Sequence, residues 1–220
     1  MSPSSSASSS PAAAARSPRS STPLRERIVE AAAELTVADG WAAVTMSRLA
    51  DRVGVSRQTV YNEVGAKPEL AQALVLWELG HFLEAVNAGF DERPAGGGAA
   101  ASSGGGSDRD ELVAAAEIAC RNVFERAESN ELMRAILLAD HGADTELLPL
   151  LTTRADSLAD AAVTVVEGRV AAYDHGLDDT RLHGLIDVLV RLVLSYVMRP
   201  QGSPAQMAEL IAWTVARVLR

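Results

Sequence analysis

The chain has 220 residues, of which 48% are hydrophobic but only 4% aromatic, and its formal net charge is −9. This composition suits one large or two small domains with cores of Ala, Leu and Val, which favours closely packed helices. No uncharged apolar run of about 18 residues occurs, which argues against a membrane span, and the N-terminus lacks the apolar core of a secretion signal. A single cysteine, Cys120, excludes an internal disulfide and fits a reducing cytoplasm, where we expect the protein to act.

The first 22 residues are mostly Ser, Ala and Pro. Such a segment cannot bury enough apolar surface to offset its chain entropy, so we predict a disordered tail at 1–22. An apolar spacing of three and four residues then predicts a helix over 25–39, closed by Gly40.

Two short helices joined by a tight turn are predicted between Thr45 and Val64. Thr45 has the side chain of an N-cap, and Gly54 stands where a helix ends in a left-handed residue. Ser56 caps the second helix, residues 57–64, on which Val60 and Val64 would point inward.

The outward face of helix 57–64 is polar and mixed, as reading the major groove requires. Arg, Gln and Asn can make paired hydrogen bonds to base edges, while Thr and Tyr reach phosphates or thymine methyls. The first 67 residues carry a net charge of +2 and the remainder −11, so positive charge is local to this part of the chain. We therefore predict DNA contacts from Thr45, Ser56, Arg57, Gln58, Thr59, Tyr61, Asn62 and Lys67.

The span from about Leu24 to Leu70 resembles the DNA-binding domain of the TetR family of bacterial regulators. The resemblance depends on the helix closed by Gly40, on Trp41 and Thr45, on the run LADRVGVS, and on TVY followed by Lys67. It implies an all-α fold with an N-terminal three-helix helix-turn-helix domain at 23–67 and a C-terminal helical ligand-binding and dimerisation domain at 68–220. It also implies a homodimer on a near-palindromic operator in double-stranded DNA. The tail 1–22 is then either an arm that contacts DNA or a dispensable terminus.

The remainder of the chain is helical in pattern, with one composition break. A long helix over 67–89 would connect the two domains. The Gly- and Ser-rich stretch 91–107 is predicted as a flexible loop, which is either a connector without a further role or a lid over the entrance of a pocket. Further helices are predicted at 110–129, 131–139, 151–172, 178–198 and 205–219.

The family resemblance places the dimer interface on the last two helices, each of which has a wide apolar face. The predicted interface residues are Leu182, Leu185, Leu189, Val193, Val197, Leu210, Ile211 and Val215.

The other helices would surround a cavity for a small hydrophobic effector. The predicted lining residues, each of which could instead be ordinary core, are Trp77, Phe82, Phe124, Met133, Leu137, Val166 and Tyr173. His141, His175 and His183 match no zinc spacing, so we expect no metal and no cofactor. Cys120 is either inert core or a redox sensor.

No catalytic motif stands out, so an enzyme is not expected. The sequence thus predicts a TetR-type transcriptional regulator, a repressor released from DNA by a small hydrophobic ligand. The alternative is a helical dimeric protein-interaction module whose DNA-binding domain has degenerated through Glu63 and Val64.

Overall fold

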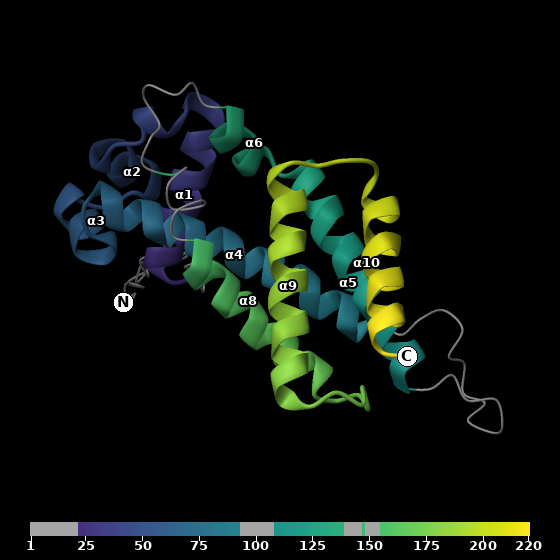
Figure 1. Ribbon diagram of the computed structural model, residues 1–220. Helices are drawn as coiled ribbons and strands as arrows, with labels where there is room; N and C mark the ends of the chain where they lie inside the picture. The colour runs from purple at the N-terminus through teal and green to yellow at the C-terminus, as the bar shows by residue number, and fades with distance from the viewer. Residues whose placement is uncertain (1–21, 93–107, 139–146, 148–154) are drawn as a thin grey trace, which may run out of the picture.

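The structure, a computed structural model, describes residues 22–92, 108–138, 147 and 155–220. In these ranges the chain is all-α (Figure 1). Its elements are α1 (Leu24–Asp39), the 3₁₀ turn η1 (Trp41–Ala43), α2 (Met46–Val53), α3 (Arg57–Val64), α4 (Lys67–Asp91), α5 (Asp108–Ser129), α6 (Glu131–Leu138), α8 (Ala155–Val170), α9 (Asp179–Met198) and α10 (Pro204–Val218).

The helix-turn-helix has the caps that the sequence predicts. Thr45 accepts a hydrogen bond from the backbone N–H of Arg48 at 3.3 Å, and Ser56 accepts one from Thr59 at 3.1 Å. Gly54 has φ +77°, the left-handed conformation that a residue with a Cβ adopts only at a cost. Thr45 thus fixes the start of α2, while Gly54 and Ser56 fix the turn between α2 and α3.

A single core holds the three N-terminal helices together and continues beyond them. Trp41, Leu49 and Val60 are buried in it. Leu132 and Ile136 of α6 belong to the same cluster, so α6 packs against α1 and is part of the N-terminal core. The N-terminal domain is therefore physically joined to the C-terminal domain by α6 as well as by α4.

The C-terminal domain is organised around α4 and α5, which lie closely side by side. A Cβ on Gly89 would come within 2.3 Å of the Ala119 Cα, so only glycine permits this approach. α10 packs along α5 and α9 packs along α8 (Figure 1).

Helix boundaries agree with the sequence to within two residues where both ends are described. α4 ends at Asp91 and not at Gly89, because Arg169 of α8 donates to the Asn87 carbonyl at 2.7 Å and pairs with Asp91. The predicted tail at 1–22, apart from its last residue, and loop residues 93–107 lie outside the described residues. Among the helices that the structure describes, none has the length and apolar character to cross a membrane.

Candidate DNA-binding face and ligand cavity

The outer face of α3 carries four exposed polar side chains, those of Arg57, Gln58, Tyr61 and Asn62. They pair along the helix at a spacing of four residues. Gln58 donates to Asn62 Oδ1 at 2.9 Å, and the Arg57 guanidinium lies 5.6 Å from the centre of the Tyr61 ring. Each pair is within reach of solvent, so its hydrogen-bonding groups can be transferred to base edges or phosphates without unfolding α3.

Three of the predicted DNA contacts are at helix caps or partly buried. Thr45 and Ser56 accept hydrogen bonds as caps, and Thr59 is half-buried, with its hydroxyl 2.8 Å from the Ser56 hydroxyl. Thr45 stabilises the start of α2, and Ser56 and Thr59 stabilise the start of α3. Their backbone groups lie at helix N-termini, where phosphate oxygens are favoured.

Lys67 is engaged within the protein. Its Nζ donates to the Trp41 carbonyl at 2.9 Å and to the Ala42 carbonyl at 3.4 Å, and it lies 5.1 Å from the centre of the Trp41 ring. An ammonium group has three donors, so one remains for a phosphate. Lys67 thus ties the start of α4 to η1 as well as carrying charge.

Sequence reasoning missed two arginines of the N-terminal helices that make contacts beyond their own helix. Arg25 donates to the Glu63 carbonyl at the C-terminal end of α3, while Arg48 pairs with Asp39. A single arginine on α1 or α2 does not reveal from the sequence which carbonyl or carboxylate it will contact.

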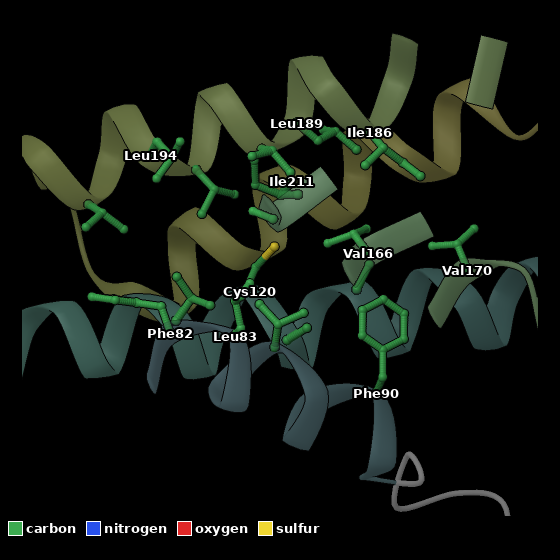
Figure 2. A pocket seen from close by; sticks show the side chains of 18 of the residues that line it. Phe82, Leu83, Phe90, Cys120, Val166, Val170, Ile186, Leu189, Leu194 and Ile211 are labelled. Atoms are coloured by element: carbon green, nitrogen blue, oxygen red, sulfur yellow. The ribbon is translucent and has the colours of Figure 1, made fainter. Parts of the chain in front are cut away.

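An elongated cavity of about 220 Å³ lies between α4, α5, α8, α9 and α10, with Met133 of α6 in its wall. Its lining runs from Val75 to Phe90 on α4, about 22 Å at ~1.5 Å per residue, and from Leu182 to Met198 on α9, about 24 Å. Figure 2 shows Phe82, Leu83 and Phe90 of α4 facing Leu189 and Leu194 of α9 across this space. A narrow apolar space of this length suits a linear chain better than a compact molecule.

Two lining residues carry titratable groups, Glu78 and Cys120. Burial raises the pKa of the Cys120 thiol to about 12, and the neighbouring Glu117 adds to the rise. A thiol with such a pKa is almost wholly protonated at neutral pH, which disfavours the redox-sensor interpretation.

Three of the predicted ligand residues, Phe82, Met133 and Val166, line the cavity. Trp77 does not, because it faces a crevice beside α1. Phe124 is buried core and packs edge-on against Tyr196 at 6.0 Å, while Tyr173 lies beyond the end of α8 against Phe90. The side chain of Leu137 lies outside the described residues.

Most of the predicted interface residues lie along the cavity. Seven of them face the cavity and so belong to the inner wall: Leu182, Leu185, Leu189, Val193, Val197, Ile211 and Val215. Only Leu210 is exposed. The cavity needs apolar side chains around it even within one subunit, so part of the apolar face of α9 and α10 serves the cavity.

The outer surfaces of α9 and α10 carry a different apolar set. Val188, Leu210, Trp213 and Val218 are exposed large hydrophobic residues, and Trp213 is 57% exposed. Sequence periodicity could not separate these positions from the inner face, because both faces of each helix carry apolar residues.

No group of three or more potential metal ligands occurs among the described residues. His183 lies 2.6 Å from Glu167 in an exposed pair, and His175 accepts a hydrogen bond from the Leu177 backbone N–H. His141 lies outside the described ranges.

Comparison with known families matches both parts of the chain. Residues 28–74 match the family described as bacterial regulatory proteins, tetR family. Residues 111–217 match the family described as bacterial tetracyclin repressor, C-terminal domain.

Relatives extend these matches across most of the chain. The HTH-type transcriptional regulator AlkX of Mycobacterium tuberculosis is 26% identical over 189 residues, covering 86% of this chain and 82% of the relative. The crystal structure of a TetR family repressor AlkX from Dietzia sp., implicated in biodegradation of n-alkanes, has a TM-score of 0.67 at 23% identity and covers 89% of this chain and 94% of that one. A putative TetR-family regulator from Mesorhizobium loti has a TM-score of 0.52 at 14% identity and covers 89% and 94%.

Proposed function

The chain belongs to the TetR family of bacterial regulators, and we propose that it represses transcription as a homodimer released from its operator by an elongated apolar ligand. It is a transcriptional regulator and not an enzyme. The observation that carries the proposal is that α4 and α6 connect the polar face of α3 to a long apolar cavity.

DNA binding is supported by the chemistry of α3. Its exposed side chains offer donors and acceptors in the combination that base edges require, and its apolar side is buried. The alternative of a degenerate domain is disfavoured because Val64 is buried and fills the core, while Glu63 is only half-exposed. Neither residue removes a donor or acceptor from the exposed face.

The homodimer is proposed to form through the outer faces of α9 and α10. Val188 on α9 and Leu210 and Trp213 on α10 would be covered by a second copy. Gly184 lies on the same side of α9 as Val188, and a Cβ there would meet no atom within 4 Å. Glycine leaves room for close approach of a partner helix. A two-fold dimer would present two α3 helices to successive major grooves, roughly 34–36 Å apart, and so bind a near-palindrome.

The effect of ligand binding that releases the protein from DNA would be transmitted from the cavity to α1 through α6. Met133 of α6 lines the cavity, and Leu132 and Ile136 on the same helix pack in the N-terminal core. A ligand that binds more tightly when α6 is in one position shifts the equilibrium toward the conformation with α6 in that position. The free energy of this shift cannot exceed the difference between the ligand's binding free energies for the two conformations. Moving α6 moves α1, and with it α3.

The class of ligand follows from the cavity. Its lining is apolar apart from Glu78 and Cys120, and it is more than about 20 Å long, which fits an extended aliphatic chain. The AlkX of Dietzia sp. is implicated in n-alkane biodegradation, which supports the same class of compound.

The test is selection of bound sequences from a random DNA pool with the full chain. We expect a near-palindrome, bound more weakly when a long-chain aliphatic compound is added. Recovery of no preferred sequence, or a monomer bound to a single half-site, would contradict the proposal.

A further inference from the structure

One end of the apolar cavity lies where its long helices begin or end. Figure 2 shows the Phe90 ring at this end, beside Val166 and Val170 and apart from Phe82. The residues that line this end are the last ones on α4 and α8, the first ones on α5 and α9, and the residue that follows α10, namely Phe90, Val170, Leu112, Leu182 and Leu219.

Two arginines tie these helix ends to one another. Arg169 of α8 donates to the Asn87 carbonyl of α4 at 2.7 Å, and its guanidinium lies 5.9 Å from the centre of the Phe90 ring. Arg109 of α5 donates to the Leu219 carbonyl at the end of α10 at 2.9 Å. Separating the helices here would break these partly buried hydrogen bonds, so this end of the cavity resists expansion.

The opposite end of the cavity adjoins the N-terminal core. Val75 of α4 and Leu158 of α8 line the cavity and also belong to the core cluster that holds α1, α2 and α3. Met133 of α6 lines the cavity as well, and α6 has only eight residues. Expansion at this end can therefore displace one short helix, whereas expansion at Phe90 would have to separate several long ones.

We propose that the cavity selects its effector by chain length, because Phe90 closes one end and α6 is displaced at the other. This rests on the proposed function, since it concerns the same ligand site and the same release from DNA. A chain shorter than the cavity fits with α6 in either position, so it binds without favouring either conformation. A longer chain fits only when α6 is displaced, and it therefore binds more tightly to the conformation that leaves DNA.

The span of the cavity sets the range of chain lengths in which this change falls. From Val75 to Phe90, α4 covers about 22 Å at ~1.5 Å per residue. An extended aliphatic chain with C–C bonds of ~1.5 Å advances about 1.3 Å per carbon, so this span corresponds to roughly 16 carbons. The side chains at the two ends occupy part of the span, so we expect the change to fall between octane and hexadecane.

The experiment supplies octane, decane, dodecane, tetradecane and hexadecane to the full chain from a silicone reservoir loaded with each pure liquid, so that all have the same chemical activity. Gas chromatography measures bound alkane, and fluorescence anisotropy measures affinity for an operator selected from the random pool. We expect octane to bind but to change operator affinity by less than about twofold, and hexadecane to lower it at least about tenfold. Operator release that does not depend on chain length among the alkanes that bind would overturn the proposal.

Phe90→Ala lengthens the cavity at its closed end. It removes a ring that extends about 4 Å beyond Cβ, so the chain length at which release begins should rise by about three carbons. Phe82→Ala is the matched control, because Phe82 lines the cavity midway along α4 and its loss widens the cavity without lengthening it. Its threshold should remain that of the wild type. An equal threshold in the two variants would overturn the proposal, and the wild-type series decides the question even if Phe90→Ala does not fold.

The outcomes separate this inference from the proposed function. If no alkane binds, or if none weakens operator binding, the cavity is not the site of an aliphatic effector and both proposals fail. If alkanes weaken operator binding equally at every chain length, only the selection by length fails.

Discussion

Asn130 joins the wall of the cavity to the start of α6, because its Nδ2 donates to Glu78 Oε1 at 2.6 Å while its Oδ1 accepts from the Met133 backbone N–H at 2.8 Å. One side chain therefore bonds to a residue of α4 beside the cavity and caps the helix that packs against α1. A displacement of α4 at Glu78 would therefore act on the start of α6 through this bond.

Asn130→Ser should weaken communication between ligand and DNA. Serine remains a good N-cap but is too short to reach Glu78, so α6 stays formed while its tie to the cavity is lost. Coupling free energies between sites are typically about 1–3 kcal/mol, and we expect a clear reduction in the ligand's effect on operator affinity. Fluorescence anisotropy of labelled operator, with and without a long-chain aliphatic compound, measures it.

Ser129→Ala is the control for this variant, since the Ser129 hydroxyl donates to carbonyls of its own helix, those of Glu125 and Arg126. If the ligand changed operator affinity in Asn130→Ser as much as in the wild type, the effect of the ligand would reach α1 by another route, such as α4.

Gln58→Ala should relax base preference at one position of the operator. Gln58 donates to Asn62 in the free protein, and both can exchange this bond for paired hydrogen bonds to an adenine. We expect a loss of about 1–3 kcal/mol on the preferred operator and little loss where that base pair is already changed. A panel of operators with single base-pair changes measures this. Equal losses on every member would instead make Gln58 a phosphate contact.

Lys67→Met tests the two roles of Lys67 together. Methionine keeps the apolar stem over Trp41 but leaves the Trp41 and Ala42 carbonyls without this donor. Removing one partner from a partly buried hydrogen bond costs about 1–3 kcal/mol, so we expect a lower thermal midpoint. If the ammonium also contacts a phosphate, the slope of log affinity against log salt should fall by about 1. A lower midpoint with an unchanged slope would leave Lys67 a structural role alone.

The sequence was informative where short-range chemistry decides the structure. The caps at Thr45 and Ser56, the turn at Gly54 and the bounds of α3 follow from the hydrogen-bonding and backbone preferences of single residues, and the structure confirms each of them. The resemblance to the TetR family was likewise confirmed by the family matches.

The sequence was less informative where two apolar faces share one helix. On α9, Leu189 faces the cavity and Val188 faces outward, one residue apart, and periodicity cannot say which side is covered by the chain's own helices. The position of Glu78 was missed for a related reason. A charged residue on an amphipathic helix is ordinarily exposed, and its burial depends on Arg126 and Asn130, about fifty residues away in the chain.

Trp213→Asp should convert the dimer to monomers. A charge at the centre of an apolar interface loses its hydration without gaining a partner, which opposes association. Leu76→Asp is a matched control, since Leu76 is 58% exposed and Trp213 57%, but Leu76 lies on α4, away from the proposed interface. Sedimentation velocity should give monomers for the first variant and dimers for the second. Leu189→Asp, which alters the cavity wall, should reduce ligand binding and not association. If the Trp213→Asp protein remained a dimer, the interface would have to lie elsewhere on the protein.

Cys120 should make the protein less stable in alkaline solution. Burial raises the pKa of its thiol from 9.0 to about 12. Below pH 9 the thiol is protonated in both states and contributes no pH dependence. Between about pH 9 and 12 the unfolded chain loses this proton while the folded protein keeps it, so the unfolded state is favoured as pH rises, by up to about 1.4 kcal/mol per pH unit.

Urea unfolding of the wild type and Cys120→Ala from about pH 8 to about pH 10.5 isolates this contribution, because other titrating groups are common to both proteins. Loss of the sulfur from the cavity wall should give a constant difference in the free energy of unfolding below about pH 9. Above that pH the wild type should lose stability faster than the variant, and the two curves should converge. Parallel curves throughout would mean that the thiol titrates alike in the folded and unfolded states, and that solvent reaches the cavity beside Cys120.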